Sequence, residues 1–126
     1  MRQFSAANIR NIALAGHAGA GKTSLAEALL YKTGATDRLG KISDGNTICD
    51  FDPEEIKRKA SLASAVAPFT FKDIKVNILD TPGLFDFAGG MYEGIRAAET
   101  VVVALSAKSG VPVGAEKAVK VAKKMG

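Results

Sequence analysis

The chain has 126 residues, of which 47% are hydrophobic, 24% charged and 6% aromatic. This length fits one compact domain, and this apolar fraction excludes an intrinsically disordered chain. The formal net charge of +4 is too small to indicate a nucleic-acid-binding protein.

Cysteine content and hydropathy restrict the possible metal sites and the cellular location of the protein. The single cysteine, Cys49, cannot form an internal disulfide, and with one histidine in the chain it cannot build a zinc site. It lies in a polar stretch, where we expect an ordinary thiol. No apolar run approaches the roughly 20 residues of a membrane span, and the first residues lack the apolar block of a signal peptide. We expect a cytoplasmic protein with no membrane partner.

The first half of the chain predicts one strand, one long helix and one short helix. Residues 9–15 form a compact apolar run that ends at a glycine, which is typical of a buried strand. Residues 22–32 carry leucine and alanine at helical spacing. Residues 35–63 are polar and irregular. Within them, residues 52–55 (Asp-Pro-Glu-Glu) provide the cap, the first-turn proline and the acidic first turn of a short helix, with Glu55 at capping-box distance.

The second half predicts a hairpin and then alternating helices and strands. The apolar runs 65–71 and 74–79 are separated by two residues, which is hairpin spacing. The remaining expected elements are a glycine-rich loop at 85–90, a helix at 91–99, a strand covered on both faces at 100–105 and a helix at 115–125. This order predicts a three-layer α/β/α fold, with a mostly parallel sheet and one antiparallel hairpin strand.

A glycine-rich motif lies between the first expected strand and the first expected helix. It fits the pattern G-x-x-x-x-G-K-[ST] at every fixed position, with Gly16, His17, Ala18, Gly19, Ala20, Gly21, Lys22 and Thr23. The glycines let successive N–H groups turn toward an anion, and the following helix directs its positive end there. Lys22 supplies a charge for the β- and γ-phosphates, and Thr23 supplies a hydroxyl for Mg²⁺. The motif predicts a phosphate-binding loop (P-loop); the alternative is a glycine-rich turn that binds nothing.

A second motif follows the expected strand at 74–79 and comprises Asp80, Thr81, Pro82 and Gly83. A carboxylate at the C-terminal end of a strand beside a P-loop can hold Mg²⁺ through water. Gly83 can offer its N–H to a γ-phosphate and move when that phosphate leaves. We expect a nucleotide sensor here, although the same four residues also suit an ordinary turn.

Together the motifs resemble the GTP-binding domain of translation elongation factor G, from Ile9 to the end of the chain. The family's G-H-I-D-A-G-K-T-T corresponds to residues 16–24, and its D-T-P-G-H-V-D-F corresponds to residues 80–87. Its R-G-I-T, whose threonine contacts Mg²⁺ and the γ-phosphate, corresponds to residues 58–61. Residues 49–59 resemble those of a divergent branch of elongation-factor-G-like paralogues.

The resemblance implies a switch that binds GTP or GDP with Mg²⁺, hydrolyses GTP and acts with the ribosome in translation elongation. It assigns nucleotide contacts to residues 16–24, which include Ser24, and to residues 80–84. It assigns the metal to Thr23, Ser61 and Asp80, and Ser64 is an alternative to Ser61.

Three positions depart from the family's pattern. Leu84 stands where the family has the histidine that orients the attacking water, and leucine can neither donate nor accept a hydrogen bond. We therefore expect weak or absent hydrolysis by the usual route, with binding retained. Gly19 replaces the family's P-loop aspartate, and Ser61 replaces its threonine while keeping a hydroxyl.

The guanine-recognition motif N-K-x-D does not occur in the sequence. Residues 106–108 (Ser-Ala-Lys) resemble the family's later base contact, but they follow directly on the strand at 100–105, which is too early. We interpret them as a coincidence. We expect residues 1–126 to be part of a GTP-binding domain that stops after its fourth strand, leaving the strand at 100–105 as an exposed edge open to self-association.

Two other functions stay open. A P-loop ATPase or kinase would need ATP preference and a general base, and His17, the one histidine, lies inside the P-loop. A non-hydrolysing ribosome-binding or regulatory module is favoured by Leu84. The lysines of the last helix suit contact with ribosomal RNA, but a solvated helix face is the interpretation we prefer, and we expect no sequence-specific nucleic-acid partner.

Overall fold

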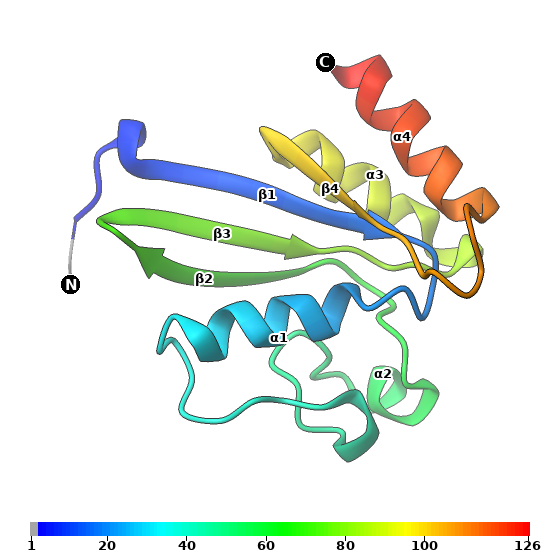
Figure 1. Cartoon of the computed structure of the whole chain (residues 1–126), viewed down its shortest axis with the longest axis horizontal. Helices are drawn as coiled ribbons and strands as arrows, with labels where there is room; N and C mark the ends of the chain where they lie inside the picture. The colour runs from blue at the N-terminus through cyan, green and yellow to red at the C-terminus, as the bar shows by residue number, and fades with distance from the viewer. Residues whose placement is uncertain (1–2) are drawn as a thin grey trace.

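The computed structural model describes residues 3–126 and has three layers, with a four-stranded sheet between helices (Figure 1). The strands are β1 (Ile9–Gly16), β2 (Ala65–Phe71), β3 (Ile74–Asp80) and β4 (Thr100–Ala104). Their order is β2-β3-β1-β4, and β1 is parallel to both β3 and β4. β2 is antiparallel to β3. The fold predicted from the sequence, including the antiparallel hairpin strand, is confirmed.

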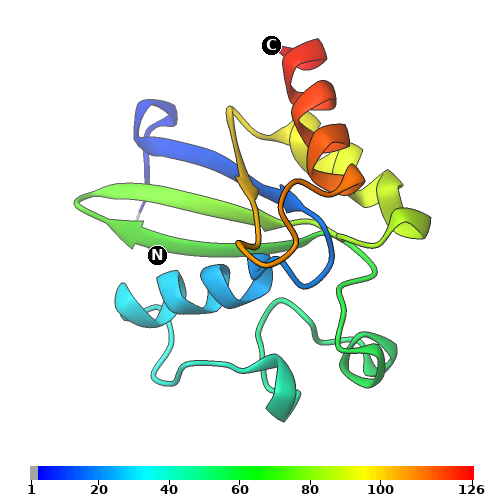
Figure 2. The ribbon, with the colours of Figure 1, turned by 45° about the vertical axis from the view of Figure 1, so that its right-hand side comes forward.

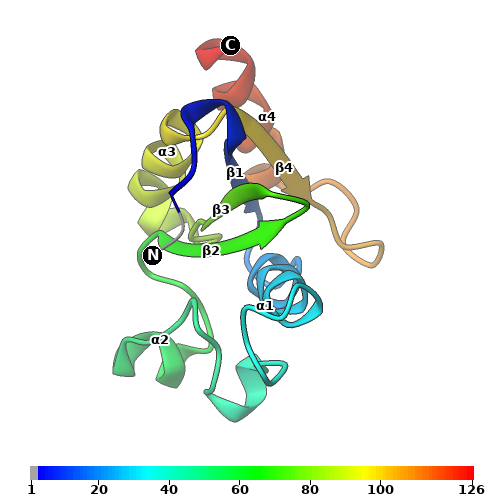
Figure 3. The ribbon, with the colours of Figure 1, turned by 90° about the vertical axis from the view of Figure 1, so that its left-hand side faces the viewer.

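The helices lie on both faces of the sheet. α1 (Lys22–Lys32) covers one face, and α3 (Ala88–Ala97) and α4 (Val113–Met125) cover the other (Figure 3). α2 (Pro53–Arg58) lies in the long connection between α1 and β2. Figure 2 shows this connection, coloured cyan to green, on the side of α1 that faces away from the sheet. No helix of residues 3–126 is long and apolar enough to cross a membrane.

Successive residues of β1 divide the core into two clusters. Leu14 packs with Leu30 of α1 and Ile78 of β3, whereas the next residue, Ala15, packs with Ile95 of α3 and Ala118 of α4. Side chains alternate between the two faces of a strand, so one apolar run supplies both clusters. The run at 9–15 is therefore a central strand buried on both faces.

Two local predictions are confirmed in detail. At the hairpin, Lys72 and Asp73 both have positive φ, 46° and 65°, as a two-residue loop that follows the twist of its strands requires. At α2, Asp52 accepts a hydrogen bond from the Glu54 N–H at 2.8 Å, and Glu55 accepts one from the Asp52 N–H at 3.2 Å. These two bonds complete a capping box, with aspartate in place of the more usual serine or threonine.

The glycine-rich loop expected at 85–90 is instead a 3₁₀ turn (Phe85–Phe87) followed directly by α3. Two glycines of α3 lie against the turn after β3. A Cβ on Gly90 would lie 2.9 Å from Pro82 Cγ, and a Cβ on Gly94 would overlap the Thr81 methyl group. These glycines let a helix pack closely on the turn and do not break it. The sequence prediction failed because glycine was interpreted as a loop signal.

The expectation that β4 is covered on both faces is wrong. Val101 and Val103 pack against the cluster formed with α3 and α4. Val102, on the opposite face, is 40% exposed, because α1 packs against β1, β2 and β3. In the described part of the chain β4 pairs with β1 alone, so it is an edge strand, as expected.

Cys49 is also placed differently from the expectation. The connection after α1 folds back over that helix, so Cys49 is 2% exposed and joins the cluster of Leu14 and Leu30. Burial, followed by the nearby carboxylates of Asp80 and Glu27, raises the pKa of the Cys49 thiol well above its usual range. An ordinary solvent-accessible thiol is therefore excluded in the folded chain.

Candidate functional site

The P-loop connects the C-terminal end of β1 to the N-terminus of α1, as its motif requires. Gly16 has a φ of 138°, and a Cβ there would lie 2.5 Å from the carbonyl oxygen of Ala104, so a side chain would push β1 and β4 apart. Gly21 caps α1 in the left-handed region, with a φ of 96°. Lys22 and Thr23 are the first two residues of α1, where backbone N–H groups have no partner within the helix. The loop therefore offers donors toward an anion.

The Lys22 side chain is buried and folds back onto the P-loop. Its Nζ donates to the His17 carbonyl at 3.0 Å, and a Cβ on Gly83 would lie 2.5 Å from the same Nζ. The Ala18 N–H donates to the Gly83 carbonyl at 3.1 Å, so the second motif closes directly on the first. Burial lowers the pKa of Lys22, and the nearby carboxylates Asp80 and Asp50 oppose this change.

Thr23 and Asp80 join the two motifs. Thr23 Oγ1 donates to Asp80 Oδ2 at 2.5 Å. Asp80 is 0% exposed, and its other oxygen, Oδ1, is buried without a hydrogen-bond partner among residues 3–126. Burial raises the pKa of Asp80 to about 6, although the Thr23 hydrogen bond and Lys22 act in the opposite direction. An unsatisfied carboxylate oxygen deep in a protein marks a position that a further group can occupy.

Ser61 extends this arrangement, and Ser64 does not. Ser61 Oγ lies 3.3 Å from Thr23 Oγ1 and donates to Asp50 Oδ1 at 2.6 Å. Ser64 Oγ donates instead to the carbonyl of Gly90 at 2.7 Å, where it ties the chain to α3. Of the two serines considered as metal ligands from the sequence, Ser61 is the one that lies beside Thr23.

Thr81 and Pro82 support the site from behind. The N–H and the hydroxyl of Thr81 both donate to the carbonyl of Leu14, at 3.2 and 2.7 Å. Pro82 is fully buried and adjoins α3. These two residues fix the end of β3 against β1 and hold Asp80 toward Thr23.

The two motifs and the connection after α1 enclose a hollow of about 90 Å³. The hollow is lined by Ala18, Gly19, Gly21, Lys22, Thr23, Ile42, Asp50, Lys59, Ala60, Ser61 and Gly83. It is smaller than the roughly 300–1,000 Å³ of most small-molecule pockets, because residues 42 and 59–61 lie over the loop.

Several of the predicted contact residues do not line this hollow, namely Gly16, His17, Ala20, Ser24, Asp80, Thr81, Pro82 and Leu84. Ser24 is exposed on α1 and does not line this hollow. Leu84 is half-buried and lines a second space of about 20 Å³. This space lies between the two motifs, at Gly16 and Gly83, and the helices α3 and α4, at Met91 and Gly114.

The sequence analysis assigned no role at the site to three buried carboxylates, of which Glu55 was expected only as part of a helix cap. Asp50 lines the hollow, and burial raises its pKa, while the hydrogen bond from Ser61 acts in the opposite direction. Glu27 and Glu55 are buried nearby and accept backbone N–H bonds from the connecting segments. No motif spacing singles out Asp50 or Glu27. The one available signal was an acidic residue on the apolar side of the predicted helix 22–32.

The donor set suits a hard divalent cation that also binds phosphate. Magnesium prefers oxygen ligands and is usually bound by one or two protein groups together with substrate phosphates. Thr23, Ser61, Asp50 and the unpaired oxygen of Asp80 supply such oxygens next to the P-loop. Within residues 3–126 there is no cluster of three or more His, Cys, Asp or Glu side chains arranged to hold a metal by itself. The residues therefore fit a cation that phosphates help to bind.

A P-loop between a strand and a helix, facing an aspartate at the end of the adjacent parallel strand, defines a P-loop nucleotide-binding domain. The sequence model of the elongation factor Tu GTP binding domain matches residues 7–126. The chain belongs to this family of translational GTPase domains.

Individual relatives agree with this assignment. An elongation factor G-like protein of Mycobacterium tuberculosis (strain ATCC 25618 / H37Rv) is 44% identical over 103 residues, which cover 82% of this chain and 14% of that protein. A mitochondrial ribosome-releasing factor 2 of Anopheles gambiae is 39% identical over 108 residues, covering 86% of this chain and 15% of that protein. A crystal structure of a protein from Thermus thermophilus matches with a TM-score of 0.90 and 47% identity, over 94% of this chain and 18% of that one. The chain thus spans about one seventh of these curated relatives.

Proposed function

We propose that the chain binds the phosphates of GTP or GDP together with Mg²⁺. The observation that carries this proposal is the Thr23–Asp80 pair, in which Asp80 Oδ1 is buried and has no hydrogen-bond partner among the described residues. In this assignment residues 16–23 hold the phosphates, Lys22 neutralises their charge, and Gly83 senses the γ-phosphate.

The balance of buried charge supports a cation at the same place. Asp50, Asp80, Glu27 and Glu55 are all buried, and Lys22 is the one buried cation among the described residues. Buried carboxylates are strongly stabilised by a bound cation, because desolvation otherwise disfavours their charged form. Thr23, Ser61 and Asp80 would hold Mg²⁺ directly or through water, with Asp50 behind Ser61. When bound, the ion would neutralise phosphate charge.

For the protein that contains this domain, we propose a ribosomal partner and GTP hydrolysis coupled to a step of translation. The family assignment supports both, and the relatives include a ribosome-releasing factor and an elongation factor G-like protein. Leu84 opposes the hydrolytic part, because it cannot orient a water molecule. A non-hydrolysing ribosome-binding module is therefore the second candidate function. GTP turnover measured with and without ribosomes separates the two.

Guanine selectivity forms a separate part of the proposal. The chain contains no N-K-x-D sequence, and the hollow described above is lined by phosphate- and cation-binding groups. We therefore propose that residues 1–126 form part of a GTP-binding domain and that the base is recognised by residues outside them.

The exposed edge of β4 is a further proposed contact. Its free backbone groups and the exposed Val102 suit pairing with a second copy of the chain. Sedimentation velocity over a range of concentrations tests this contact. Val102→Lys is expected to abolish any association, and a monomer at every concentration would contradict it.

Calorimetric titration of the 126-residue chain with GTP in the presence of Mg²⁺ tests phosphate binding. We expect saturable binding that Lys22→Ala weakens at least about tenfold, because charged hydrogen bonds to phosphate are strong. Lys32→Ala, at the far end of the same helix, is the matched control and should leave the affinity unchanged. Binding that is insensitive to Lys22 would contradict the proposal.

A further inference from the structure

Glu27 carries an acidic group where the pattern of α1 calls for an apolar one. It is 1% exposed, and its neighbours in the helix, Ala26 and Leu30, belong to the core. Among the described residues no Lys or Arg forms an ion pair with it. Burying an ionised carboxylate is costly unless hydrogen bonds satisfy it. The contacts of this carboxylate therefore indicate what it does.

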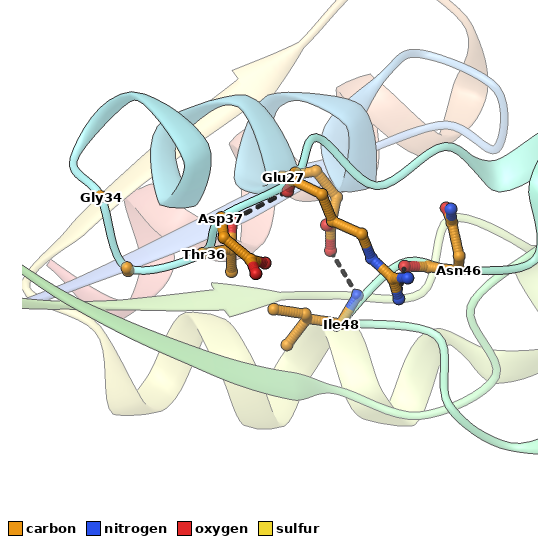
Figure 4. A pocket seen from close by; sticks show the side chains of 8 residues that line it. Glu27, Gly34, Thr36, Asp37, Asn46 and Ile48 are labelled. Atoms are coloured by element: carbon orange, nitrogen blue, oxygen red, sulfur yellow. Dashed lines mark hydrogen bonds between the residues drawn. The ribbon is translucent and has the colours of Figure 1, made fainter.

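Glu27 accepts two hydrogen bonds from the backbone of the connection after α1, and its carboxylate also interacts with the Cys49 thiol, whose pKa it raises. Glu27 Oε1 accepts a hydrogen bond from the Ile48 N–H at 2.6 Å and a second from the Cys49 N–H at 3.3 Å. Figure 4 shows the Glu27 side chain directed from α1 toward the nitrogen of Ile48. One buried carboxylate thus joins α1 to Ile48 and Cys49, which lie 21 and 22 positions after Glu27 in the sequence.

The opposite side of the carboxylate is confined by Gly40. A Cβ at this position would overlap Glu27 Oε2 and would lie 3.0 Å from Cα of Thr47. The carboxylate is therefore held between two stretches of the same connection. Replacement of Gly40 by any other residue would displace it.

The residue after Cys49 is Asp50, which accepts the hydroxyl of Ser61 at 2.6 Å. A second buried carboxylate holds the chain on the far side of Ser61, because Glu55 Oε1 accepts from Leu62 N–H at 3.0 Å and Ala63 N–H at 3.3 Å. Glu55 belongs to the connection itself, whereas Glu27 belongs to α1, the helix that begins at the P-loop. Glu27 therefore links this segment to α1 at a second point, in addition to the contact of Thr23 with Ser61.

We propose that Glu27 is a positioning residue, which fixes residues 47–50 to α1 and so sets Asp50 and Ser61 opposite Thr23. The inference rests on the proposed function, since positioning matters only if Mg²⁺ and phosphate bind there. Glu27 itself does not line the hollow in which phosphate and Mg²⁺ would bind. Release of this anchor would let the connection move away from the P-loop, whose hollow it now narrows.

Cys49 provides a direct measurement of the anchor, because it is the single thiol and is buried beside Glu27. The experiment is the rate of reaction of dithiobisnitrobenzoate with the folded chain. We expect Glu27→Ala to react roughly 10- to 100-fold faster than the wild type, because two hydrogen bonds to a charged group are lost. Glu27→Gln keeps an accepting oxygen and should restore slow labelling.

Val121→Ala is the control for a general loss of stability, because Val121 lies in the core cluster on the other face of the sheet. Denaturant is adjusted until its global stability equals that of Glu27→Ala. Equal labelling of the two variants under these conditions would overturn the anchoring role, as would equal labelling of Glu27→Gln and Glu27→Ala.

The second measurement is the affinity for GDP with Mg²⁺ and with EDTA. We expect Glu27→Ala to lose most of the Mg²⁺-dependent gain in affinity and to keep the affinity measured in EDTA. If the wild type shows the gain and Glu27→Ala retains it, the positioning role is wrong and the proposed function stands. If the wild type binds no nucleotide, the proposed function fails, and the labelling rates alone decide whether Glu27 anchors the segment.

Discussion

Thr23 Oγ1 donates to Asp80 Oδ2 at 2.5 Å and leaves Oδ1 of the same carboxylate buried without a partner. These two residues are 57 positions apart and belong to the two motifs of the site. The parallel pairing of β1 and β3 brings them together, because both strands end at the same edge of the sheet. A carboxylate in this state is destabilised until a cation or proton reaches it. The ionised Asp80 side chain therefore lowers the stability of the chain without a ligand, while it favours the binding of a cation.

The burial of the Asp80 carboxylate makes the stability of the folded chain depend on pH. The pKa of Asp80 is raised in the folded chain from an ordinary value of 3.8 to about 6, so the folded state binds this proton more tightly than the unfolded state does. The contribution of Asp80 to stability is therefore greatest below about pH 4, decreases between about pH 4 and 6, and is constant above.

Asp80→Asn removes that dependence without a large change in shape. In the absence of Mg²⁺ we expect the variant to match the wild type at about pH 4 and to be more stable by about 3 kcal/mol above pH 6. Urea unfolding at several pH values measures the difference between the two proteins, which reports on Asp80 together with its interaction with the nearby carboxylates Asp50 and Glu27. A variant that is less stable than the wild type at pH 7 would contradict the assignment.

Ser61 and Ser64 are a matched pair for testing the metal site. Ser61→Ala removes a hydroxyl that lies 3.3 Å from Thr23 Oγ1, and we expect it to weaken Mg²⁺-dependent GDP binding about tenfold. Ser64→Ala removes a hydrogen bond to Gly90 and should lower stability by about 1 kcal/mol without changing the dependence on Mg²⁺. Fluorescence titration with a labelled GDP in Mg²⁺ and in EDTA distinguishes the two. Equal effects of the two substitutions on Mg²⁺ dependence would exclude a specific role for Ser61.

Replacement of Leu84 by histidine tests whether this position limits GTP hydrolysis. In the intact parent protein we expect Leu84→His to raise ribosome-stimulated GTP turnover at least about tenfold, since a positioned general base or water-orienting group contributes roughly 10²–10⁴. The half-buried side chain at 84 adjoins Ala88 and Met91, so folding and nucleotide affinity must be verified first. Unchanged turnover with both of these intact would show that position 84 does not limit hydrolysis.

Nucleotide selectivity tests the claim that the base is recognised outside residues 1–126. We expect GTP and ATP to bind this chain with affinities within about tenfold of each other, because the groups that line the hollow suit phosphate and cation. Calorimetry with both nucleotides under the same conditions measures the ratio. A strong preference for GTP would show that the chain contains a base contact that the sequence and the site do not reveal.

The elements with strong local signals were predictable from the sequence. The apolar runs of β1 and β3, the two-residue hairpin loop and the capped start of α2 depend on neighbouring residues, and all are confirmed. The start of α3 was missed because Gly90 and Gly94 serve a contact with Pro82 and Thr81 that sequence spacing does not show.

The motif half of the site was predictable, whereas the half that comes from the connection after α1 was not. Lys22, Thr23 and Asp80 stand at fixed positions of two motifs, and parallel pairing brings them together. Asp50 and Glu27 lie near them because a long irregular segment folds back over α1. Nothing in the periodicity of a polar segment predicts that path, and Cys49 was misplaced for the same reason.

We propose that Thr23 and Asp80 form the Mg²⁺ site for a bound nucleotide. The most direct test is the ratio of GDP affinities in Mg²⁺ and in EDTA, measured for the wild type and for Thr23→Val, which removes the hydroxyl and keeps the side-chain volume. We expect at least about a tenfold gain in affinity with Mg²⁺ for the wild type, almost none for Thr23→Val, and equal affinities of the two proteins in EDTA. A gain of the same size in both proteins would contradict it.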